Sequence, residues 1–275
     1  MKLSAMIRCL ITVLCVCLLW LWGIDNTAFA QVETSQFTEQ QLKKGDKTAQ
    51  KAIEAIERGD FDRAEAYWTE LIEEFPQNPA VWSNRGNVRI SQHKIEDAIA
   101  DFDRSIAIAP QYPDAYLNRG IAYEGQQDWN LALSDYNHVL EISPSDPVAY
   151  NNRGNAKAGQ QKWQEALEDY EKAVALAPNF SLARANAALV TYQIGDSTEA
   201  TRQMRNLVRK YPMFPDVRAA MSAILWVDGK QGEAESNWVA AVGLDNRYQN
   251  LDWVAKVRRW PPKMVEALKQ FLTLN

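Results

Sequence analysis

Few side chains in this 275-residue sequence are of the kinds that carry out catalysis or bind a metal. Its two histidines, His93 and His138, are far apart in sequence, and neither has a cysteine or another histidine beside it. An isolated imidazole is usually a surface or packing residue, because metal sites and acid–base catalysis need further groups. The glycines recur at regular intervals and form no phosphate-binding loop. We therefore expect no catalytic residue, no metal site and no cofactor.

Carboxylates are plentiful, and some of them are spaced so that they could act as paired acids. The clearest groups are Asp97, Asp101 and Asp103, and Glu168 with Asp169. Charged residues at helical spacing are more typical of the solvated face of a helix. We expect these carboxylates to lie on a solvent-exposed outer face.

Asparagines that recur at a fixed interval offer a different chemistry. Four of them follow one another at intervals of 34 residues and three more lie close by: Asn84, Asn118, Asn152 and Asn186, with Asn87, Asn151 and Asn155. A carboxamide both donates and accepts hydrogen bonds, so such a row could bind the backbone of an extended peptide. The same amides could instead tie one helix to the next. The sequence leaves both interpretations open.

The asparagines belong to a longer repeat, which indicates the elements that position them. Alanine and proline recur at the same interval, as Ala64, Ala98, Ala132, Ala166, Ala200 and Ala234, and as Pro76, Pro110, Pro144, Pro178 and Pro212. A second set of prolines suits the first turn of a helix, with Asn78 and Asp146 as N-caps: Pro79, Pro113, Pro147 and Pro215. Each unit is therefore predicted to be helix, turn, helix. We expect glycines to supply the left-handed backbone of the turns: Gly59, Gly125, Gly159, Gly195 and Gly229.

Each unit also has an aromatic and a small residue on its first helix, and a second large apolar residue after the alanine. In the central units these are Trp82, Tyr116 and Tyr150, then Gly86, Gly120 and Gly154, then Phe102, Tyr136 and Tyr170. This pattern resembles the tetratricopeptide repeat. The resemblance implies an all-α solenoid of six helix-turn-helix hairpins with a C-terminal capping helix. It also implies that the first helices line a concave groove for a protein or peptide partner.

The resemblance divides the chain into nine segments. They are a signal peptide at 1–30, a polar segment at 31–44, repeats at 45–78, 79–112, 113–146, 147–180, 181–214 and 215–248, and a cap at 249–275. The first, fifth and sixth repeats are degenerate, and a docking tail is the alternative for the last segment. Its Trp260-Pro261-Pro262 run is similar to that of exported tetratricopeptide proteins of cyanobacteria and of the thylakoid lumen of chloroplasts.

Basic residues in the repeats do not form the carboxylate clamp by which some members of the family hold a C-terminal peptide. The clamp positions carry Asp46, Ala80, Asp114, Val148, Ser83, Leu117 and Asn151 instead. Three arginines occupy a position where the family usually has leucine: Arg85, Arg119 and Arg153. We expect their stems to pack and their charged heads to reach solvent.

The first 30 residues have the form of a secretory signal peptide. Lys2 and Arg8 precede an apolar run, and Ala28-Phe29-Ala30 suits cleavage before Gln31. An uncleaved membrane anchor is the alternative, and it would be the chain's one link to a membrane. All three cysteines fall in this leader, so the mature chain would form no disulfide: Cys9, Cys15 and Cys17. After it, Thr38 and Gln41 resemble a capping box that starts the first helix.

These features together predict a non-catalytic, exported scaffold for protein–protein interaction. A net charge of −5 makes nucleic acid a poor partner. The leader predicts a location in the periplasm or the thylakoid lumen, where the chain would bind an extended peptide or partner protein in its groove. Assembly of a membrane or photosynthetic complex is one such role. The alternative is an accessory subunit or cryptic enzyme of cell-envelope synthesis.

Overall fold

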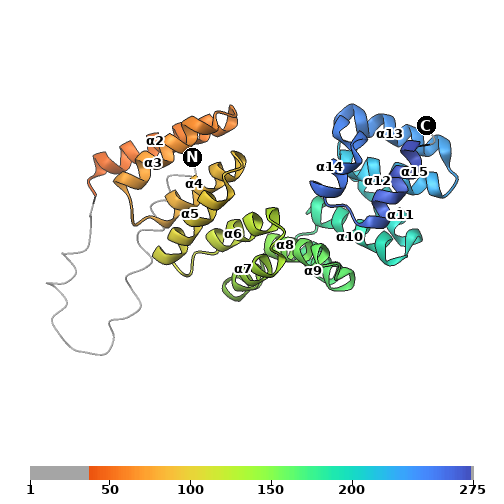
Figure 1. Ribbon diagram of the computed structural model, residues 1–275, viewed down its shortest axis with the longest axis horizontal. Coiled ribbons are helices and arrows are strands. Elements are labelled where there is room, and N and C mark those ends of the chain that lie inside the picture. Colours follow the sequence, from red (N-terminus) through yellow and green to blue (C-terminus); the bar gives the residue numbers. More distant parts are fainter. Residues whose placement is uncertain (1–36, 274–275) are drawn as a thin grey trace. The chain divides into compact units, whose positions relative to one another are not determined.

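A computed structural model describes residues 37–273 of the chain (Figure 1). The predicted signal peptide, its cysteines and residues 31–36 of the polar segment therefore lie outside the described residues. Within those residues, no helix combines the length and the apolar character needed to cross a membrane.

Fourteen α-helices, one short 3-10 helix and no strand make up the described residues. Twelve of the helices form six consecutive hairpins: α2 (Glu39–Glu57) with α3 (Phe61–Glu74), α4 (Pro79–Ser91) with α5 (Ile95–Ile108), α6 (Pro113–Gly125) with α7 (Trp129–Ile142), α8 (Pro147–Gly159) with α9 (Trp163–Leu176), α10 (Ser181–Ile194) with α11 (Ser197–Lys210), and α12 (Pro215–Val227) with α13 (Gln231–Leu244). The chain ends with η1 (Asn246–Gln249), α14 (Leu251–Lys256) and α15 (Pro262–Thr273). The predicted fold class, a solenoid of six hairpins with a capping helix, is confirmed.

The chain divides into two compact units, one ending at Asp101 and the other beginning at Phe102. The first unit has its own core between α2, α3 and α4, built around Trp68, Leu71 and Val88. The larger core of the second unit lies among α10 to α15. Here the partners of each hairpin lie side by side, as α8 and α9 do in Figure 1.

Helix starts follow the local sequence as predicted. Pro79 and Pro147 occupy the first turn of α4 and α8. The side chains of Asn78 and Asp146 accept hydrogen bonds from backbone N–H groups two or three residues later, in the first turn of the helix. The capping box of Thr38 is also present at α2. These caps satisfy donors that a helix leaves without partners at its start.

Small residues let the two helices of a hairpin approach closely. A Cβ atom on Gly120 would lie 2.5 Å from Cε1 of Tyr136, and one on Gly154 would lie 2.7 Å from Cε1 of Tyr170. The repeated alanines of the second helices are fully buried. The third and fourth hairpins therefore each close around one tyrosine ring, which only a residue without a side chain can cover.

The turns inside the hairpins differ from the prediction at two glycines. Gly59, Gly195 and Gly229 do adopt positive φ, but Gly125 and Gly159 end their helices, and the left-handed residues are Gln127 and Gln161. His93 does the same in the second hairpin, with φ of 62°. The left-handed residue always comes at the same place in the turn, so its position is set by turn geometry and not by where glycine occurs.

The C-terminal helix α15 packs on the first helices α12 and α10. Phe271 makes edge-to-face contacts with Trp226 of α12 and Trp238 of α13, with ring centroids 5.3 and 5.2 Å apart. Met264 and Leu268 on the same face are fully buried. This helix covers the apolar side of the last two hairpins, as a solenoid end requires.

Candidate partner-binding surface

A repeated arginine–aspartate pair joins the two helices of each central hairpin. We call the three pairs the arginine ladder: Arg85 with Asp101, Arg119 with Asp135, and Arg153 with Asp169. In each pair Nε lies 2.9 Å and Nη2 lies 2.7 Å from the two carboxylate oxygens. This two-bond geometry is the strongest that the two side chains can form.

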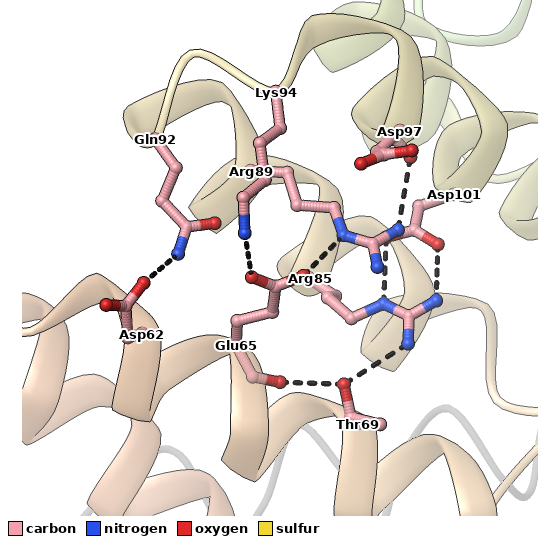
Figure 2. A network of polar contacts seen from close by, with 9 residues as sticks. All are labelled: Asp62, Glu65, Thr69, Arg85, Arg89, Gln92, Lys94, Asp97 and Asp101. Carbon is pink, nitrogen blue, oxygen red and sulfur yellow. Dashed lines mark hydrogen bonds and ion pairs between the residues drawn. The ribbon is translucent and has the colours of Figure 1, made fainter.

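The ladder also joins each hairpin to the one before it. Nη1 of Arg85 donates to Thr69 at 3.2 Å, as Figure 2 shows. The corresponding nitrogens of the other two arginines donate to Asp103 at 2.6 Å and Asn137 at 2.9 Å. Each guanidinium further lies over the aromatic ring three residues earlier on its helix. One side chain thus fixes both the closure of a hairpin and its stacking on a neighbour.

Two sequence predictions are corrected by the ladder. The arginine heads do not reach solvent, because their side chains are only 12 to 23% exposed. Asp101 and Asp169 are not on a solvated face either, being 2% and 4% exposed. The arginine heads were expected in solvent, whereas each of them forms a buried ion pair with an aspartate.

Further polar contacts surround the first rung of the ladder in the first unit (Figure 2). Arg89 bonds to Glu65 at 2.8 Å and to Asp101 at 2.9 Å, and Lys94 lies 2.7 Å from Glu65. Burial by itself would raise the pKa of Glu65, but the hydrogen bonds from Lys94 and Arg89 lower it to about 2. Glu65 is therefore ionised at neutral pH, and the cluster links α3, α4 and α5.

The predicted asparagines fall into two groups. Four of them form a connected set in which Asn186 of α10 donates to Asn151 and Asn155 of α8, and Asn151 donates to Asn152. The hydroxyl of Tyr170 also donates to Asn155, at 3.0 Å. These amides tie α8 to α10, while Asn155 and Asn186 remain partly exposed.

The other three asparagines lie on other first helices. Asn118 is a half-buried residue of α6. Asn84 is half-buried and Asn87 exposed, both on α4 in the first unit. The seven asparagines thus belong to both compact units, and whether the amides bind a peptide stays a prediction.

A buried carboxylate on α6 forms a second polar centre, which the sequence analysis missed. Oε2 of Glu124 accepts from Nη1 of Arg259 at 2.6 Å, and Oε1 accepts from the hydroxyl of Tyr136 at 2.6 Å. The guanidinium of Arg259 lies 5.7 Å from the ring centroid of Trp129. We call Glu124, Trp129 and Tyr136 the Glu124 pocket. Burial raises the pKa of Glu124, and the charge of Arg259 opposes that rise.

Arg259, which enters the Glu124 pocket, belongs to the segment that joins α14 to α15. We call this segment, residues 257–261, the C-terminal connector. Asp216 of α12 holds the connector on either side of Arg259: its Oδ1 accepts from Nε of Arg258 at 3.0 Å and from Nε1 of Trp260 at 2.9 Å. Nη2 of Arg258 lies 2.9 Å from Oδ2 as an ion pair without hydrogen-bond geometry. Just beyond, the backbone N–H of Lys263 donates to Gln193 of α10.

The histidines are explained by local packing. His138 lies against the ring of Tyr116 at 4.3 Å and contacts Glu141, while His93 forms a turn. No group of three or more potential metal ligands occurs within residues 37–273. The arrangement thus offers charge, amides and aromatic faces for binding.

The sequence contains a signal for Glu124 but none for its pairing with Arg259. The position of Glu124 in its unit is taken by uncharged residues in the other five, namely Ile56, Ile90, Ala158, Tyr192 and Trp226. Its partner Arg259 lies 135 residues away in sequence, so no local pattern pairs them.

Three tetratricopeptide-repeat family models match the chain, at residues 50–113, 87–154 and 147–180. No curated protein matches it. A solved tetratricopeptide-repeat protein from Parabacteroides merdae is 19% identical, with a TM-score of 0.62, and the match covers 84% of this chain and 98% of that one.

Two further solved structures share the fold. A thermophilic tetratricopeptide protein of Thermus thermophilus has a TM-score of 0.57 at 19% identity, covering 66% of this chain and 99% of that one. YrrB, described as having an unusual peptide-binding site, has a TM-score of 0.50 at 17% identity, covering 74% and 97%. The matched repeats, together with the hairpins described above, place the chain in the tetratricopeptide-repeat family.

Proposed function

We propose that this chain is a non-catalytic scaffold that binds an extended segment of a partner protein along the first helices of its second unit. The observation that carries the proposal is the chain's own C-terminal connector. Side chains from α6, α10 and α12 hold the connector and the start of α15, through Glu124, Gln193 and Asp216. The surface formed by these first helices therefore already binds a segment of the chain that is neither helix nor strand.

The surface offers the groups that such binding needs. Exposed apolar side chains of α6 and α8, Ile121 and Val148, lie on first helices together with the partly exposed amides of Asn155 and Asn186. Apolar side chains supply burial, and amides match the donors and acceptors of a peptide backbone. YrrB has the same fold and, by its description, a peptide-binding site, so the fold is compatible with the role.

A photocrosslinking experiment on the full chain tests the proposal. Two large exposed apolar residues of one hairpin form a matched pair: Ile121 on the first helix α6, 40% exposed, and Leu131 on the second helix α7, 49% exposed. A crosslinking amino acid at 121 should give one discrete adduct in cell-envelope preparations, and the same amino acid at 131 should not. Equal adducts from both positions, or none from 121, would contradict the proposal.

We further propose that the chain is exported and works in the periplasm or thylakoid lumen, where assembly of a membrane or photosynthetic complex would use such a scaffold. Support comes from the basic and apolar leader and from the Trp260-Pro261-Pro262 run. The acidic net charge of −5 also favours protein over nucleic acid as partner. Sequencing the N-terminus of the purified native protein should give Gln31. A chain that keeps Met1 in the cytosolic fraction would contradict export.

A further inference from the structure

The Glu124 pocket is occupied by a residue of the chain itself, and the chemistry of the pocket indicates what else it can hold. We propose that this pocket recognises an arginine side chain of the partner segment, and that Arg259 fills it while the partner is absent. This inference rests on the proposed function and names the chemistry of the bound segment.

The pocket is built to hold a planar cation. Glu124 is only 5% exposed, so its ionised carboxylate is costly to bury without a positive partner. Tyr136 already satisfies one carboxylate oxygen, which leaves the other for a single cationic donor. The ring of Trp129 packs against the backbone of Gly159, where a Cβ would lie 2.7 Å away, and so presents a fixed aromatic face. A guanidinium suits this combination of carboxylate and ring better than an ammonium group does.

The exposure and the backbone conformation of Arg259 would allow its side chain to be displaced from the pocket. Its side chain is 40% exposed although its head is paired, and its backbone has φ of 54°, which residues with side chains rarely adopt. Withdrawal of Arg259 would relieve that conformation.

The neighbouring contacts would persist when Arg259 withdraws. Arg258 and Trp260 on either side are both bonded to Asp216, and α15 is packed through Phe271. Only the tip of the connector needs to move, so the pocket can open without unfolding the cap.

The repeat pattern gives an independent reason to see the pocket as a special site. Glu124 stands at a position where no other unit carries a charge. If this position served only the packing of the repeats, an apolar residue would be expected at it, such as Ile90 and Trp226 in their repeats.

Peptide binding to the full-length Arg259→Ala variant tests the proposal. The probe is a fluorescent, N-acetylated and C-amidated peptide with the sequence of residues 259–262, Arg-Trp-Pro-Pro, compared with the same peptide carrying neutral citrulline for arginine. We expect the variant to bind the arginine peptide at least tenfold more tightly than the citrulline peptide. The wild-type chain should bind the arginine peptide at least fivefold more weakly than the variant does, because Arg259 competes.

The control is Arg259→Ala combined with Glu124→Gln, which keeps an acceptor for Tyr136 but removes the charge. In this double variant the arginine and citrulline peptides should bind equally, while circular dichroism shows a folded chain. Persistent discrimination in the double variant, or none in Arg259→Ala, would overturn the proposal. If the crosslink from position 121 survives in either case, only the arginine preference is lost and the scaffold function stands.

A second copy of the chain is the competing occupant, since its Arg259 carries the same side chain. Light scattering over a range of protein concentrations separates the two. A wild-type monomer at all concentrations is expected. A dimer that Arg259→Ala abolishes would overturn the proposal in favour of exchange between copies.

Discussion

The arginine ladder leads to a graded prediction, because its three rungs differ in how many cations hold the carboxylate. Asp101 is also paired with Arg89 and Asp169 with Lys157, both within 2.9 Å. Among the described residues, Asp135 is paired only with Arg119. Replacing Arg119 by methionine keeps most of the packed stem but leaves a carboxylate that is 4% exposed without a cation.

The size of the effect follows from that difference. Breaking a buried ion pair by removing one partner costs about 3–5 kcal/mol, because the remaining charge stays desolvated. We expect Arg119→Met to fall in this range. Arg153→Met should cost less, about 1–3 kcal/mol, because Lys157 remains 2.8 Å from Asp169 and still pairs with the buried carboxylate after the ion pair with Arg153 is lost. The lost contact to Asp103 adds little, since that carboxylate is 55% exposed.

The pH dependence of the effect has a definite sign. Burial raises the pKa of Asp135, and Arg119 works against that rise. Without Arg119 the pKa of Asp135 in the folded state should rise further above its unfolded value. The variant's stability is then lost as pH rises through that folded pKa, so the deficit against wild type shrinks towards acid pH and grows towards neutral pH.

Hydrogen exchange measured by mass spectrometry is the suitable assay, because a stack of repeats can open locally. Amides of α6 and α7 report the free energy of opening of this hairpin, and urea unfolding followed by circular dichroism reports the whole chain. Equal costs for Arg119→Met and Arg153→Met would refute the reasoning. So would an Arg119→Met/Asp135→Leu double variant as unstable as the single one, since removing both charges should recover most of the loss.

Three further predictions follow from single residues. Gly154→Ala should destabilise the fourth hairpin by about 1–3 kcal/mol in urea unfolding, because its Cβ would meet the ring of Tyr170 at 2.7 Å, and an unchanged midpoint would contradict this. Gln161→Gly should stabilise the same hairpin by about 1 kcal/mol, because Gln161 has φ of 61°, and a loss of stability would contradict it. Burial raises the pKa of Glu124 above 4.5, so the wild-type stability relative to Glu124→Gln should fall as pH rises above about that value; a difference independent of pH would contradict it.

Repetition explains how much of the fold could be predicted from the sequence. Alanine, glycine and proline recur at one interval, so each hairpin supports the interpretation of the next, and the caps at Asn78 and Asp146 follow from local chemistry. The arginine ladder was equally present in the sequence. Only the three repeats with arginine at the position of Arg85, Arg119 and Arg153 carry aspartate at the facing position, where the others have Tyr67, Gln203 and Asn237. The ladder was not predicted because the charged heads of the arginines were expected to lie in solvent.

The Glu124 pocket could not be predicted in the same way. Its two charged partners belong to α6 and to the connector, and their meeting depends on the path of the chain after the last hairpin. A repeat pattern describes contacts between neighbouring units, and this contact skips several of them. The sequence showed only that Glu124 is out of place among apolar residues.

The second unit changes its mode of stabilisation along its length, and the change bears on the surface that we propose for a partner. In the last two hairpins α15 covers the first helices, and the ladder positions there hold Ala187 and Met221, both buried. In the two hairpins before them, Arg119 and Arg153 of the arginine ladder supply contacts to the preceding hairpin. The first helices α6 and α8 therefore need no covering helix. They can therefore keep a polar, partly open surface without losing their stacking. The Glu124 pocket and the amides of α8 belong to this stretch, so the proposed partner segment would lie along α6 and α8, with α10 contributing the partly exposed Asn186.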